Sequence, residues 1–214
     1  MNNYKEIKRN NGAFLNQLKL MTEYVNAAAN LYGFVDSDVF LSWLTDDMDM
    51  TVPFETKQPI DHWMITLISI TALSQKHYYY HGSEFASNKF VNIEDATMFD
   101  MVLDTRPDFP PYIPSKSEIK RFSYSTFDKN SLPYKRFTKE LRKVAKDYNM
   151  VHYIITTELI KGSNITQLIN ILNQEDIIVF NSAEEMDTFA ESVFTLNNDT
   201  RMWVNYGNKP DELD

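Results

Sequence analysis

Apolar side chains recur at helical spacing in the first part of the chain. Between residues 12 and 32 they return every three or four positions with polar residues between them, which predicts an amphipathic helix. Gly33 follows, and a glycine just past a helix supplies the left-handed backbone that other residues disfavour. Asp36 or Ser37 can then cap a second helix, so the pattern predicts a helical hairpin. The apolar positions of the first helix are Phe14, Leu18, Met21, Val25 and Ala28.

Residues 133–148 carry two parallel stripes, one apolar and one basic. Because both stripes follow the helical period, they predict one amphipathic helix with a cationic outer surface. The basic stripe is the candidate interaction surface of the chain. The apolar stripe consists of Phe137, Leu141, Val144 and Tyr148, and the basic stripe consists of Lys135, Lys139, Arg142 and Lys146.

Three more helices are predicted towards the C-terminus. One covers residues 151–160 and stops at Gly162, and the next starts at Ser163 or Asn164. The last is opened by the capping-box pattern of residues 182–185, in which a serine is followed three positions later by a glutamate.

The middle of the chain is less regular. Residues 62–91 mix an apolar run that suits a buried helix with β-branched and aromatic residues that suit strands, and we predict a small β element there. Residues 106–114 contain four prolines and predict an extended connector. Ser115 and Glu118 then form a capping-box pattern at the start of a short helix.

These elements predict a mainly α fold with a helical hairpin, a C-terminal helical bundle and the small β element. The 214 residues suit a single domain. A division into two subdomains, residues 1–105 and 115–214, is the alternative, because the proline-rich connector lies between them. With 43% hydrophobic and 14% aromatic residues, the chain has enough apolar surface for a substantial core.

Composition removes several classes of function. The chain has no Cys, which excludes a disulfide scaffold, a thiol nucleophile and cysteine-ligated zinc or iron–sulfur centres. The first twenty residues are polar and charged where a signal peptide needs an apolar core. The longest apolar-leaning run, residues 64–73, is too short to span a bilayer. We therefore expect a cytoplasmic protein without a membrane segment.

The net charge of −9 is distributed unevenly. Residues 34–61 hold seven acids and one base, residues 112–146 hold ten bases and three acids, and residues 175–199 hold seven acids and no base. An acidic chain disfavours binding of nucleic acid or anionic membrane by the surface as a whole. The basic segment nevertheless leaves a nucleic-acid binder as an alternative function, with acids such as Glu184, Glu185, Asp187 and Glu191 as candidates to neutralise it internally.

The predicted hairpin also has the spacing of a DNA-binding helix-turn-helix, through Ala29, Gly33 and Val39. Its second helix would carry Asp36 and Asp38 and no Lys or Arg close by, so it would repel phosphate. The pattern therefore indicates a packed hairpin.

His77, His81 and Glu84 form the one candidate metal site in the sequence. On a helix their spacing places all three on one face, and on a strand the two histidines still share a face. Such a set would support a metal-dependent enzyme, with a ligand position left for water. The alternative is an aromatic strand, because three tyrosines separate the histidines. We favour the strand and expect no metal and no cofactor.

Arg201 allows two interpretations. It can contact an anion together with the asparagines around Gly207, or it can join Trp203 in holding the C-terminal tail against the domain. The second is favoured, because a terminal segment needs tethering to be ordered.

Three stretches of the chain resemble a group of uncharacterised proteins from low-GC Gram-positive bacteria and their mobile elements. The resemblance implies a mostly helical fold and no particular activity. Some members of that group continue into a Cys-rich zinc-binding tail of the SecA type, for which this chain has no cysteines. The stretches are NAAANLYGFV, PPYIPSKSEIKRFSY and a tail with Asn198, Thr200, Arg201, Trp203, Gly207, Pro210, Glu212 and Leu213.

The sequence contains no nucleophile elbow, phosphate loop, dinucleotide fingerprint or kinase signature. We therefore expect a non-catalytic binding or regulatory protein of a bacterium, phage or plasmid, with an unidentified protein partner and self-association left open. The metal-dependent enzyme and the nucleic-acid binder are the alternatives.

Overall fold

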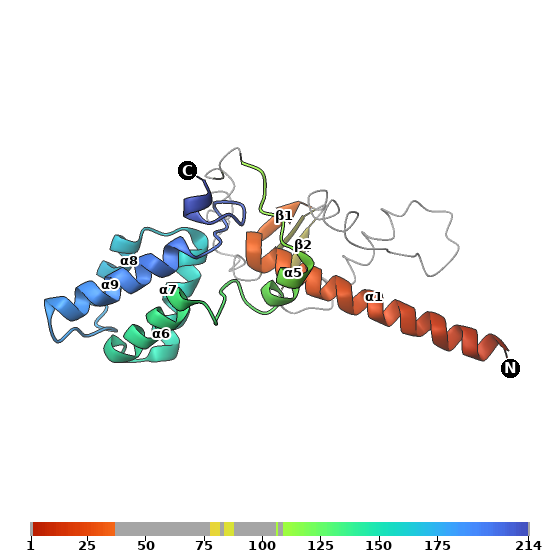
Figure 1. Cartoon of the computed structure of the whole chain (residues 1–214), viewed down its shortest axis with the longest axis horizontal. Helices are drawn as coiled ribbons and strands as arrows, with labels where there is room; N and C mark the ends of the chain where they lie inside the picture. The colour runs from red at the N-terminus through yellow and green to blue at the C-terminus, as the bar shows by residue number, and fades with distance from the viewer. Residues whose placement is uncertain (1, 37–77, 82–83, 88–105, 107–108, 214) are drawn as a thin grey trace. The chain divides into compact units, whose positions relative to one another are not determined.

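The protein is mainly α-helical, as predicted. A computed structural model of the chain describes residues 2–36, 78–81, 84–87, 106 and 109–213 (Figure 1). The chain divides into two compact units, one comprising Met1–Phe99 and Ile113–Ser125 and the other Asp100–Tyr112 and Thr126–Asp214. The short helix after the proline-rich connector thus belongs to the first unit, whereas the predicted subdomain boundary placed it in the second.

Helix α1 (Asn2–Tyr32) is the longest described element of the first unit. It begins ten residues before the predicted start, because the Lys, Glu and Arg residues of the N-terminus are good helix formers even without an apolar stripe. Buried residues line its C-terminal half, where Met21, Val25 and Ala28 of the predicted stripe are fully buried.

Gly33 ends α1 as predicted. Its φ is 67°, and its N–H donates to the carbonyl of Ala29 at 3.0 Å. The next residues form strand β1 (Phe34–Asp36), whose backbone is satisfied by pairing with residues 84–86. Asp36, one of the two predicted helix caps, is thus the last residue of a strand, and Ser37, the other, lies outside the described residues. The rest of the predicted second helix lies outside the described residues.

Strands β2 (Tyr78–His81) and β3 (Glu84–Ser87) lie inside the range where a small β element was predicted. The three described strands form one antiparallel sheet in the order β1-β3-β2. A strand placed next to the end of α1 therefore pairs with residues some fifty positions later in the chain.

Helix α5 (Lys116–Phe122) has the predicted capping box, in which the N–H of Ser115 donates to the Glu118 carboxylate at 3.0 Å. The helix packs on α1 within the first unit. Its buried residues are Ile119 and Phe122, and Asn30 of α1 donates from its side-chain amide to the Phe122 carbonyl at 2.7 Å.

The second unit contains helices α6 (Leu132–Val144), α7 (Tyr148–Lys161), α8 (Ile165–Gln174) and α9 (Ala183–Asn198), followed by a 3-10 turn η1 (Pro210–Glu212) (Figure 1). The predicted C-terminal end of α7 and the predicted starts of α8 and α9 are confirmed, whereas α7 begins at Tyr148, before the predicted start at residue 151. Gly162 has a φ of 83° at the end of α7, and the side chains of Asn164 and Ser182 cap the next two helices. The buried core of this unit includes Phe137, Leu141, Val144, Val151, Ile155, Leu159, Leu168, Leu172, Phe189, Val193 and Leu196.

The helix predicted over residues 133–148 is in fact two elements. Helix α6 ends at Val144, and Ala145 is extended and forms an isolated β-bridge with Ile178. Asp147 then caps α7 by accepting from the Met150 N–H at 3.0 Å. The apolar spacing does not reveal this break. Tyr148, the first residue of α7, is four residues after Val144, which is the spacing that a continuous helix would also have.

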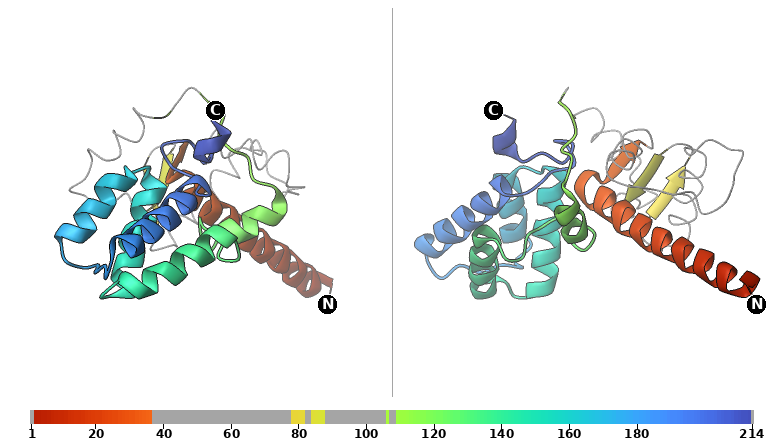
Figure 2. Two further views of the ribbon diagram at one scale, coloured as in Figure 1. Left: turned by 60° about the vertical axis from the view of Figure 1, so that its left-hand side comes forward. Right: turned by 45° about the vertical axis from the view of Figure 1, so that its right-hand side comes forward.

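Helices α6 and α9 lie side by side and antiparallel (Figure 2). The end of α6 meets the segment before α9, where the Val179 N–H donates to the Val144 carbonyl at 2.8 Å. Eight residues back along α6, Arg136 pairs with Glu191 in the middle of α9. Moving backwards along one helix therefore means moving forwards along the other.

No described helix has both the length and the apolar character needed to cross a membrane.

Candidate interaction surface

The outer side of α6 is cationic. The buried residues Phe137, Leu141 and Val144 face the core. Because the basic stripe follows the same period on the other side of the helix, all four of its members are exposed, as predicted: Lys135, Lys139, Arg142 and Lys146. Lys146 differs from the other three because it lies in the connection after α6.

Among the described residues, acids neutralise three of the six bases between residues 135 and 146. Arg136 pairs with Glu191 of α9 at 2.7 Å. Glu191 is one of the acids predicted from the sequence to neutralise this basic segment. Lys143 pairs with Glu140 on the preceding turn of α6. Lys146 pairs with Asp176 at 2.6 Å, which removes it from the candidate surface as an unpaired charge.

The other three bases form a row on α6. None of the ion pairs among the described residues involves Lys135, Lys139 or Arg142. Their spacing of four and three residues places them on one face of the helix, over about 10 Å of its length. We call these three residues the α6 cationic row. Arg142 also lies 5.4 Å from the centroid of the Tyr148 ring, a cation–π distance that leaves its guanidinium at the surface.

Behind this row lies an aromatic cluster that the sequence analysis did not identify. Tyr134 of α6 and His152 of α7 share a hydrogen bond of 2.9 Å between the phenol oxygen and Nε2. The imidazole also packs against the rings of Phe137 and Tyr148, with centroids 5.9 Å and 5.6 Å away. The two partners are eighteen residues apart, so no local spacing signals their contact.

Both groups of this pair are held in their neutral forms. Burial lowers the pKa of His152, and the charge of Lys129 lowers it further. Burial also raises the pKa of Tyr134, with a smaller contribution from Tyr148. A neutral imidazole can accept from the Tyr134 phenol through Nε2, so this contact needs no charge on either side chain.

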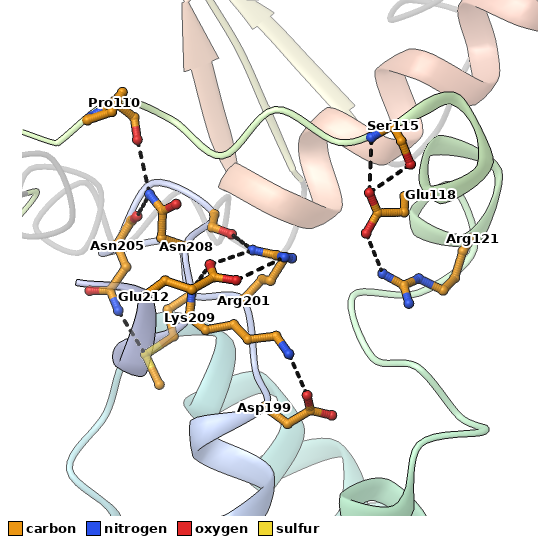
Figure 3. Close-up of polar contacts among 12 residues, drawn as sticks. Pro110, Ser115, Glu118, Arg121, Asp199, Arg201, Asn205, Asn208, Lys209 and Glu212 are labelled. Atoms are coloured by element: carbon orange, nitrogen blue, oxygen red, sulfur yellow. Dashed lines mark hydrogen bonds and ion pairs between the residues drawn. The ribbon is translucent and has the colours of Figure 1, made fainter. Parts of the chain in front are cut away.

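Arg201 holds the C-terminal tail, which is the interpretation favoured from the sequence (Figure 3). Its guanidinium donates to both carboxylate oxygens of Glu212, at 2.9 Å and 3.3 Å, and to the Gly207 carbonyl at 3.1 Å. It also lies 3.2 Å from the centroid of the Tyr112 ring. The side chain is buried, and the anion that it contacts is the carboxylate of its own tail.

The same tail is bound at two further places. Trp203 is fully buried, and its N–H donates to the Ile160 carbonyl at the end of α7 at 2.8 Å. Asn208 donates to the Pro110 carbonyl at 3.0 Å (Figure 3). The Tyr112 N–H donates to the Tyr206 carbonyl at 3.1 Å. The tail therefore joins the C-terminal end of α7 to the described part of the proline-rich connector.

The candidate metal residues fall on strands. His81 ends β2 and Glu84 begins β3, and the antiparallel register pairs these two positions directly. His77 lies outside the described residues, as does His62. The helical arrangement that would place all three candidates on one face is therefore wrong for His81 and Glu84, because they lie on two different strands. Within the described ranges, no group of three or more acidic or histidine side chains is placed to hold a metal ion.

The chain matches no protein-family model, no curated protein and no solved structure. Interpretation of its surface therefore depends on the geometry of its own side chains.

Proposed function

We propose that this chain is a non-catalytic binding protein that recognises an acidic surface on a protein partner through the α6 cationic row. This proposal is supported by the difference between the bases of this segment that pair with an acid and those that do not. Three bases of the same segment have internal acidic partners, whereas Lys135, Lys139 and Arg142 have none among the described residues. Three like charges on one helix face repel each other, so the row is suited to an external anion.

An acidic protein is a better partner for this row than nucleic acid. Glu191 and Asp176 lie beside the row in ion pairs with its neighbouring bases, and the acid-rich α9 runs along α6. These acids reduce the positive potential away from the helix, which long-range attraction of a phosphate backbone requires. A protein partner contacts the three cations at short range and avoids the flanking acids through its shape.

The resemblance to proteins of low-GC Gram-positive bacteria and their mobile elements supports a bacterial, phage or plasmid origin. We place the protein in the cytoplasm as part of this proposal, because the sequence contains no cysteine.

The test is affinity purification from a low-GC Gram-positive host with three matched baits. These are the wild-type chain, the Lys139→Glu/Arg142→Glu variant, and a Lys116→Glu/Lys120→Glu control that changes the net charge equally on α5. Wild type and control are expected to retain the same acidic protein, and the α6 variant is expected to lose it. If the α6 variant retains that protein, the proposed role of the cationic row is wrong.

A further inference from the structure

Helix α9 has an exposed acidic row beside the α6 cationic row. Glu184, Asp187 and Glu191 are exposed on its outer side, and Phe194 continues the same face with 56% of its surface accessible. Leu132 similarly begins the α6 face and is 78% exposed. Each helix therefore presents three like charges and one large apolar side chain, with opposite charges on the two helices.

The spacing of the two rows is the same. Along α6 the positions are 132, 135, 139 and 142, with steps of three, four and three residues. Along α9 they are 184, 187, 191 and 194, with the same steps. Each row spans about 15 Å. In antiparallel alignment Leu132 is opposite Phe194, and the three bases are opposite the three acids: Lys135 with Glu191, Lys139 with Asp187, and Arg142 with Glu184.

The two rows do not satisfy each other within one chain. Helices α6 and α9 are antiparallel neighbours, and the ion pair that joins them links Arg136, at the edge of the cationic row, to Glu191, a member of the acidic row. This pair remains exposed, with 40% of the Arg136 side chain and 64% of the Glu191 side chain accessible. The three bases of the cationic row, together with Glu184 and Asp187 of the acidic row, thus enter none of the ion pairs among the described residues, and Glu191 is shared with Arg136.

We infer that the α6 and α9 rows bind the α9 and α6 rows of a second copy of this chain. A twofold axis parallel to the two antiparallel helices places α6 of each copy opposite α9 of the other, with antiparallel direction in both contacts. The symmetry doubles every contact, giving six base–acid pairs and two Leu132–Phe194 contacts. This inference deepens the proposed function and rests on it, because it names the acidic partner of the same surface.

The ion pairs and apolar contacts of the proposed dimer determine how its stability depends on concentration and salt. Exposed ion pairs are individually weak and are screened by salt, so such a dimer depends on concentration and ionic strength. The two apolar contacts are less sensitive to salt and fix the register, because a shift along the helices would place Leu132 or Phe194 against a charge.

Sedimentation velocity of the wild-type chain tests the inference without any mutation. At about 100 µM chain and about 50 mM salt a dimer is expected, and about 500 mM salt is expected to raise its dissociation constant at least tenfold. A chain that is monomeric at low salt and at this concentration overturns the inference.

Two charge-reversed variants test the pairing. Lys139→Glu/Arg142→Glu places acids opposite acids in its own homodimer, and Glu184→Lys/Asp187→Lys places bases opposite bases. Each alone is expected to weaken self-association at least tenfold. An equimolar mixture is expected to restore the dimer as a heterodimer, because one contact is then wild type and the other has both signs reversed. The Lys116→Glu/Lys120→Glu control is expected to dimerise like wild type.

A wild-type dimer that neither variant weakens, or variants whose mixture stays monomeric, would mean that the two rows do not meet. The results also separate this inference from the proposed function. A monomeric chain that still captures an acidic host protein through α6 overturns the inference alone. A chain that neither dimerises nor loses a host protein when the α6 row is changed overturns the proposed function as well.

Discussion

Gly162 lies between the end of α7 and the C-terminal tail, and its backbone is left-handed with a φ of 83°. A Cβ atom at this position would lie 2.3 Å from Cγ2 of Val204. The residue therefore meets two requirements at once: it terminates a helix, and it lets the tail approach the helix end closely. The first requirement is visible in the sequence, whereas the second depends on a residue forty-two positions later.

We expect Gly162→Ala to lower the free energy of unfolding by at least about 2 kcal/mol, because left-handed strain and the Val204 contact add. Urea denaturation measures the change. Gly12→Ala is the matched control, because Gly12 lies inside α1 with no heavy atom near its virtual Cβ. That variant is expected to gain about 0.5–1 kcal/mol. A neutral Gly162→Ala would contradict the close approach of the tail.

His152 makes the stability of the second unit depend on pH. Its pKa is lowered in the folded chain, first by burial and then by Lys129, so the unfolded chain binds the proton more readily. Stability from this group is therefore present above the unfolded pKa of about 6.5 and is lost as the pH falls through the folded pKa.

We expect the melting temperature of the wild-type chain to fall more than that of His152→Gln between about pH 7.5 and pH 5.5. In NMR spectra, the imidazole C–H resonances of His152 are expected to titrate with a midpoint below about pH 6.5. A midpoint above this value would mean that the Tyr134–His152 cluster is not buried as described.

At the scale of the elements, the junction between α6 and α7 depends on Asp147. The apolar period continues across it, but Ala145 leaves the helical conformation with ψ of 128° and bridges to Ile178. Asp147 then satisfies an N–H in the first turn of α7. A strong cap and a tertiary bridge together end a helix that its periodicity alone would extend.

Replacing Asp147 by Ala is expected to cost about 0.5–2 kcal/mol, because the first turn of α7 loses its capping acceptor. Asp147→Asn is the matched control and should cost much less, since its side-chain oxygen can still accept. Urea denaturation of both variants measures the difference. Equal losses would indicate that the charge of Asp147, rather than its capping hydrogen bond, supports the junction.

For the whole molecule, the distribution of charge decides which partners are suitable. A net charge of −9 opposes approach to a polyanion, and the α6 cationic row is too small to reverse it. Acids held in ion pairs beside the row reduce its potential further.

We therefore expect no mobility shift of duplex DNA or single-stranded RNA by micromolar protein at an ionic strength of about 0.15 M. A shift that weakens steeply with salt, and that the Lys139→Glu/Arg142→Glu variant abolishes, would instead make the cationic row a nucleic-acid site.

Local signals in the sequence predicted local structure correctly. Gly33 and Gly162 end helices, and Ser115, Asn164 and Ser182 begin them, because a cap involves only residues within one turn. The exposure of the basic stripe on α6 was also predictable, since helical period alone determines which side chains share a face. Strand β1 was not predictable in this way, because its pairing partner β3 lies far along the chain.

The sequence by itself thus determined the mainly α class, the end of α7, the starts of α8 and α9, and the separation of apolar from basic faces on α6. Only the tertiary structure decided which charges remain without partners. It brings Glu191 to Arg136 and Glu212 to Arg201, and it leaves the α6 cationic row unpaired among the described residues. The physical reason is the sequence separation over which each interaction acts. Helix formation depends on neighbours within four residues, whereas an ion pair between helices depends on which helices the core brings together.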